Sequence, residues 1–144
     1  MPILTDPLGW FALELPEGWE SETEDCVTTL RGPLGLGVVF VSGGRHAGGR
    51  QRNFGGADFL VRFLRSIGVK VPEDSIGCIE GVGCRLYSFE REEAGRVWRY
   101  WSITDDETAL LVSYTCAAED EGEEDGEVEE IVRSIRLFHS APIH

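Results

Sequence analysis

The chain has 144 residues, 42% of them hydrophobic and 27% charged, a composition typical of a soluble globular protein. Its formal net charge is −13, which disfavours nucleic acid as a partner because phosphates would be repelled. The sequence contains neither an apolar stretch of membrane-spanning length nor a basic segment followed by an apolar run. We therefore expect a single domain, residues 1–144, located in the cytoplasm.

The first half of the chain predicts strands followed by one helix. Residues 10–15 alternate with the period of a half-buried strand, and Pro16-Glu17-Gly18 forms a turn in which glycine permits a positive φ. Later the apolar period becomes that of a helix, which Gly68 ends. The expected elements are strands at 10–15, 26–31 and 36–42, a glycine-rich loop at 43–56 and a helix at 59–67.

The second half predicts an antiparallel meander and a closing helix. The segment 97–104 is apolar or aromatic on both sides except at Arg99, which indicates a central strand covered on both faces. Nine acids between residues 119 and 130 precede the helix, and acids at a helix N-terminus suit its dipole, so we expect them to form a solvated first turn. The expected strands are 75–80, 84–91, 97–104 and 109–116, and the helix carries Val128, Ile131, Val132 and Ile135.

Four segments carry a family resemblance: Phe11–Trp19 (FALELPEGW), Arg99–Trp101, Leu111–Thr115 and Val128–Leu137 (VEEIVRSIRL). Together they resemble the PsbP-like superfamily, which also includes the Ran-binding Mog proteins and bacterial relatives. The resemblance implies an α+β fold, in which an antiparallel sheet of about six or seven strands is flanked by helices as an α/β/α sandwich. Family members resemble adaptors: a photosystem subunit, a Ran-binding factor and chaperones of type VI secretion effectors. No catalytic motif carries over.

Basic residues are concentrated in one segment. Residues 43–70 hold six basic residues and one acid, a net charge of +5, whereas the rest of the chain holds seven basic and 25 acidic residues, a net charge of −18. Arginines in a glycine-rich loop can grip carboxylates or phosphates, although the same loop could be a solvated connector. We predict that partner binding involves Arg45, His46, Arg50, Arg52, Trp98 and Tyr100.

Cofactor chemistry finds little support in the sequence. The four cysteines, Cys26, Cys78, Cys84 and Cys116, include no pair at the C-x-x-C spacing of a zinc site. We expect them to be reduced and to behave as small buried hydrophobic residues. No metal and no cofactor is predicted.

Three functions follow from these patterns. We expect an acidic bacterial protein that is not an enzyme: a protein-binding adaptor or chaperone-like module, monomeric or weakly dimeric. Its partner would be another protein with an acidic segment. One alternative is a toxin-neutralising immunity protein that acts through the acidic region 119–130. The other is an enzyme, such as a hydrolase, centred on His46, with Cys78 or Cys84 as the nucleophile.

Overall fold

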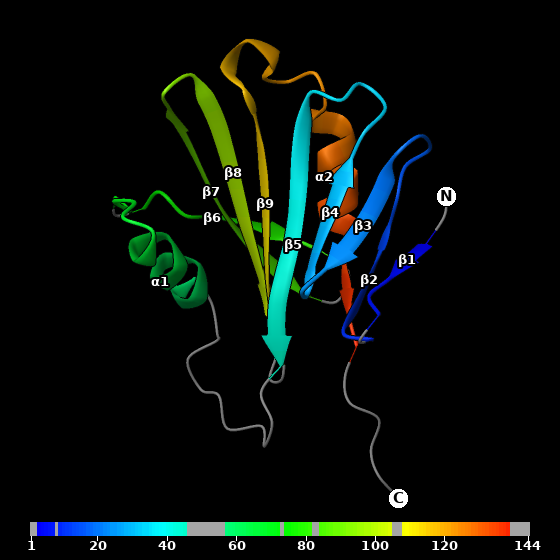
Figure 1. Ribbon diagram of the computed structural model, residues 1–144. Coiled ribbons are helices and arrows are strands. Elements are labelled where there is room, and N and C mark those ends of the chain that lie inside the picture. Colours follow the sequence, from blue (N-terminus) through cyan, green and yellow to red (C-terminus); the bar gives the residue numbers. More distant parts are fainter. Residues whose placement is uncertain are drawn as a thin grey trace, which may run out of the picture.

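A computed structural model gives the fold of the protein and describes residues 3–7, 9–45, 57–72, 74–81, 84–104 and 108–138. Its main element is a seven-stranded antiparallel sheet in the order β3-β4-β5-β9-β8-β7-β6 (Figure 1). The strands are β3 (Glu20–Glu24), β4 (Val27–Arg31), β5 (Gly37–Arg45), β6 (Gly77–Glu80), β7 (Arg85–Glu93), β8 (Arg96–Thr104) and β9 (Thr108–Ala117).

A second, three-stranded sheet joins the two ends of the described chain. Its order is β1-β2-β10, with β1 at Ile3–Thr5, β2 at Phe11–Glu14 and β10 at Arg136–Leu137. In the register of this sheet Leu137 lies opposite Phe11. The segments Phe11–Trp19 and Val128–Leu137, which resembled family motifs, are therefore neighbours in space.

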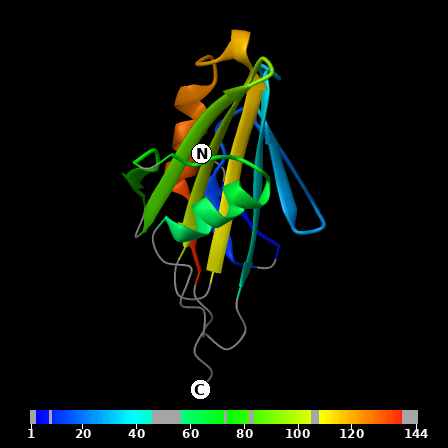
Figure 2. The ribbon, with the colours of Figure 1, turned by 90° about the vertical axis from the view of Figure 1, so that its left-hand side faces the viewer.

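The two helices lie on opposite faces of the large sheet. Helix α1 (Asp58–Ser66) lies on one face of the sheet, here called the outer face (Figure 2). There Leu60 and Leu64 pack against residues of β7, β8 and β9. Helix α2 (Asp125–Ser134) and the small sheet cover the other, inner face; a short 3₁₀ turn, η1 (Ala118–Asp120), precedes α2. This arrangement is the expected α/β/α sandwich.

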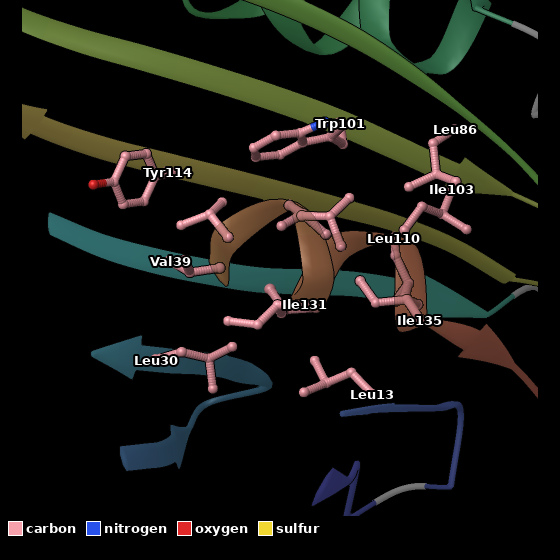
Figure 3. Close-up of a cluster of buried hydrophobic side chains, with 14 of the residues drawn as sticks. Leu13, Leu30, Val39, Leu86, Trp101, Ile103, Leu110, Tyr114, Ile131 and Ile135 are labelled. Carbon is pink, nitrogen blue, oxygen red and sulfur yellow. The ribbon is translucent and has the colours of Figure 1, made fainter. Parts of the chain in front are cut away.

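The main core lies between the inner face, α2 and the small sheet. Figure 3 shows Ile131 and Ile135 between Leu13 of the small sheet and Trp101 of the large one. Burying a side chain of this size contributes roughly 1.5–3 kcal/mol relative to leaving it exposed. The closing helix is therefore held by its apolar stripe, as its sequence period predicted.

The sequence predicted seven of the strands but missed the short β1 and β10 and the longer β3. All five residues of β3 are exposed, and its glutamates lack the β-branched or aromatic side chains that indicate a strand. A two-residue turn, Asp25-Cys26, connects β3 to β4, and both residues have positive φ. Cys26 thus belongs to a turn rather than to the strand predicted at 26–31.

Candidate functional site

The described residues cover only part of the outer face of the large sheet. Helix α1 contacts the β8 side of the sheet, and Figure 1 shows no helix in front of β3, β4 and β5. Strand register places Val38 of β5 beside Thr115 of β9, Thr115 beside Trp98 of β8, and Trp98 beside Arg91 of β7. These four residues form one row across the sheet, next to the area that α1 covers.

Trp98 is fixed at the border of the covered area. Its ring stacks on that of Tyr100, with 6.0 Å between centroids and 7° between planes, and Phe63 of α1 lies 6.1 Å from Tyr100. Tyr100 is 3% exposed, so it supports Trp98 from within the core, whereas Trp98 is half-buried. Of the two aromatic residues predicted to bind a partner, only Trp98 offers accessible surface.

Two arginines lie near Trp98: Arg91 is opposite it on β7, and Arg96 comes two residues earlier on β8. Arg91 donates a hydrogen bond from Nε to the hydroxyl of Tyr100 at 3.4 Å, and it is also paired with Glu93. Arg96 donates from Nε to Oγ1 of Thr115 at 3.2 Å. The hydrogen bond to Tyr100 raises the pKa of Arg91, because it favours the charged form. We call this surface the Trp98 patch; it comprises Val38, Arg91, Arg96, Trp98 and Thr115.

The predicted arginine loop does not join this patch through Arg45. Arg45 ends β5 opposite Thr108, whereas Val38 lies near the start of the same strand. Seven residues of strand separate their backbones by roughly 23 Å. His46, Arg50 and Arg52 lie outside the described residues. The loop and the aromatic residues were predicted as one set, but Arg45 and Trp98 stand at opposite ends of the sheet.

The inner face carries a charge cluster that the sequence did not reveal. Arg99 of β8 lies over the ring of Trp101 at 4.8 Å and is only 12% exposed in its side chain. Its nitrogen atoms lie 2.8 Å from Glu90, 3.5 Å from Asp125 and 2.6 Å from Glu129. A buried cation needs such partners, because the loss of hydration is costly.

The charge cluster around Arg99 lowers the pKa of Glu129. Burial alone would raise the pKa of its carboxyl group, but hydrogen bonds from Arg99 and Arg133 outweigh burial and hold the pKa below its ordinary value. The two arginines donate to different oxygens of the carboxylate, at 2.6 and 3.2 Å. The cluster therefore ties α2 to β8.

A second buried carboxylate lies just before α2. Glu124 is 2% exposed, and its Oε1 accepts a hydrogen bond from the Tyr114 hydroxyl at 2.7 Å. Burial and this bond raise the pKa of Tyr114 far above its ordinary value. Nearby, Glu127 accepts a hydrogen bond from the indole of Trp19 at 2.9 Å. The expectation of a solvated acidic first turn is therefore wrong for Glu124.

The cysteines also depart in part from expectation. All four are free, and Cys116 is buried, but Cys26 and Cys78 are exposed. Burial raises the pKa of the Cys116 thiol. Within the described part of the chain, no group of three or more His, Cys, Asp or Glu side chains could hold a metal ion. Likewise, no described helix has the length and apolar character of a membrane span.

Comparison with known proteins addresses the fold. No family model and no curated protein matches the sequence. Among solved structures, the solution structure of cyanobacterial PsbP (CyanoP) from Synechocystis matches with a TM-score of 0.67 and 12% identity, over 95% of this chain and 92% of that one. The chain has a PsbP-like fold.

A second structure agrees with the PsbP-like fold. A crystal structure from Bacteroides thetaiotaomicron matches with a TM-score of 0.68 and 17% identity over 96% of this chain. The chain spans about half the length of that protein, 48% of it. At such identities the likeness establishes the PsbP-like fold alone, and function has to be inferred from the surface.

Proposed function

We propose that this protein is a non-enzymatic protein-binding module of the adaptor type, and that its docking surface is the Trp98 patch. The observation that carries the proposal is a half-buried tryptophan that stacks on Tyr100 and lies beside two arginines, on a part of the outer face that no described helix covers. Tryptophan and arginine are the residue types most enriched among residues that dominate binding energy at interfaces. The occupant we propose is an acidic segment of another protein.

Charge and rigidity both support this choice. In a chain of net charge −13, the patch presents Arg91 and Arg96 beside Trp98, with Glu93 as the acid paired to Arg91. Stacking on Tyr100 and packing under α1 hold Trp98 in place before a partner arrives, which reduces the entropy lost on binding. Val38 extends the apolar surface in the same row.

Binding experiments with three variants test this proposal. A partner is captured from source lysate with the wild-type chain, identified, purified and titrated calorimetrically. Trp98→Ala and Arg96→Glu are expected to weaken binding at least tenfold, and wild-type binding should weaken as salt rises because the contact is ionic. Arg136→Glu, an exposed charge reversal on β10, should leave affinity within about twofold of wild type, as expected away from the interface.

Two results would contradict the proposal. One is an Arg96→Glu variant that binds the purified partner as tightly as wild type. The other is an affinity that does not change between low and high salt, which would exclude an acidic partner segment. Near-native circular dichroism of each variant must accompany either result.

A further inference from the structure

A cavity of about 410 Å³ opens on the inner face, beside the edge strand β6. Small residues create the space: Gly77 of β6 lies opposite Ser88 of β7, and Ser88 lies opposite Trp101 of β8. All three residues line the cavity. A Cβ atom on Gly77 would lie only 2.8 Å from Oγ of Ser88. The volume falls within the range of about 300–1,000 Å³ typical of small-molecule pockets.

One residue of the cavity wall holds a buried donor without a hydrogen bond. Trp101 is 1% exposed, and its indole Nε1 has no hydrogen-bond partner among the described residues. The neighbouring Arg99 is different, because its Nε and Nη1 are paired with Glu90 and Asp125. Figure 3 shows the indole nitrogen on the ring edge away from Ile131. Because this nitrogen can only donate, the cavity favours a ligand with an acceptor.

The charge around the cavity determines whether a neutral or an anionic ligand is favoured. Glu90, Asp125 and Glu129 surround Arg99, and Arg133 is paired with Glu129, so this cluster carries one more negative than positive charge. An anionic ligand would therefore be repelled. Glu90 also lines the cavity, and its exposed carboxylate can accept a hydrogen bond from a ligand. The site thus combines a donor, Trp101, with an acceptor, Glu90.

We propose that this cavity binds a neutral carboxamide group. Its carbonyl oxygen accepts the hydrogen of Trp101 Nε1, and its amide N–H donates to the carboxylate of Glu90. A carboxylate would face Glu90 with like charge, and an amine would leave Trp101 unpaired. The amide belongs either to a free small molecule or to a glutamine side chain in a peptide. The site lies on the face opposite the Trp98 patch and does not depend on docking there.

NMR of the full ¹⁵N-labelled chain tests the binding directly. The indole signal of Trp101, assigned from its loss in Trp101→Phe, is followed during titration with benzamide and with benzoate, which share a shape and differ in charge. Capped glutamine and capped glutamate form the corresponding peptide pair. We expect a saturable shift with at least one amide and at least tenfold weaker binding of its matched carboxylate. The pair that binds identifies the source of the amide.

Two variants establish that the shift comes from the cavity. Ser88→Val and Gly77→Ala each add atoms inside it and should weaken amide binding at least tenfold. The indole signal of Trp19, which is bonded to Glu127, serves as an unmoved internal reference. The proposal is overturned if neither amide shifts Trp101 saturably, if benzoate or capped glutamate binds as tightly, or if the filled variants that fold bind as well as wild type. These results do not depend on the docking experiment.

Discussion

Arg99 shows how one residue connects elements that lie far apart in the sequence. It comes from β8, but its charge partners are Glu90 of β7 and Asp125 and Glu129 of α2. Because Arg99 is largely buried, removing any of these partners leaves charge that solvent compensates poorly. The cluster therefore makes the attachment of α2 to the sheet sensitive to pH.

We predict that the ion pairs of Glu129 make the stability of the folded protein depend on pH, and that Glu129→Gln removes this contribution. The pKa of Glu129 is lower in the folded state than its unfolded value of 4.5. The carboxylate therefore contributes its full stabilisation when the pH is above 4.5, and this contribution is lost as the pH falls through the folded pKa. Urea unfolding at several pH values should show wild type more stable than Glu129→Gln at pH 7, with the difference shrinking below pH 4.5.

The neighbouring acid provides a matched control for this measurement. Glu130 is exposed on the same helix, so Glu130→Gln should change stability little at any pH. If Glu129→Gln and Glu130→Gln gave the same pH profile, the ion pairs with Arg99 and Arg133 would not be the cause.

At the scale of elements, backbone spacing between strands β5 and β9 depends on a glycine. Gly37 lies opposite Cys116, and a Cβ atom there would lie 2.6 Å from the ring of Tyr114 and 2.7 Å from the carbonyl oxygen of Thr115. The backbone carbonyl cannot move without disturbing the strand. Glycine at this position allows the buried Tyr114 to reach Glu124.

We predict opposite effects for the same substitution at two glycines. Gly37→Ala should destabilise the fold by about 1–3 kcal/mol through overpacking. Gly126→Ala, in the first turn of α2 with open space around its Cβ position, should stabilise it by up to about 1 kcal/mol, because alanine favours the helix. Thermal or urea unfolding of both variants measures this. Equal effects in one direction would contradict the close contact at Gly37.

At the scale of the whole molecule, the net negative charge destabilises the compact folded state. Strand β3 forms an edge of the large sheet and carries Glu20, Glu22 and Glu24 on one face. Acidic side chains on an exposed edge oppose pairing with the edge of another molecule. The same charges repel one another within the folded chain, whose total is −13.

Salt should therefore stabilise this protein. Raising sodium chloride from about 10 to 200 mM shortens the range of charge repulsion, so the urea midpoint of wild type is expected to rise. Glu22→Gln should raise the midpoint at low salt, and the gain should shrink at high salt. A midpoint that falls as salt increases would mean that ion pairs such as those of Arg99 outweigh the repulsion.

The sequence predicted the elements whose residues follow a clear period. Strand β8 is central and covered on both faces, as its double-sided apolar pattern indicated, and Gly68 ends α1 with φ of +82°. Sequence patterns did not predict the burial of residues that follow no regular period. For example, the acidic run before α2 gives no sign that Glu124 is buried against Tyr114, which lies on the inner face opposite Val39 in register.

The sequence by itself determined most of the secondary structure, because hydrophobic periodicity and turn residues act locally along the chain. The PsbP-like architecture was expected from the resemblance of four segments to that superfamily. Only the tertiary structure decided which side chains meet. It separated Arg45 from Trp98, joined Arg99 to α2, and left the indole N–H of Trp101 unpaired beside a cavity. These contacts depend on strand order and register, which couple residues distant in sequence and leave no local pattern.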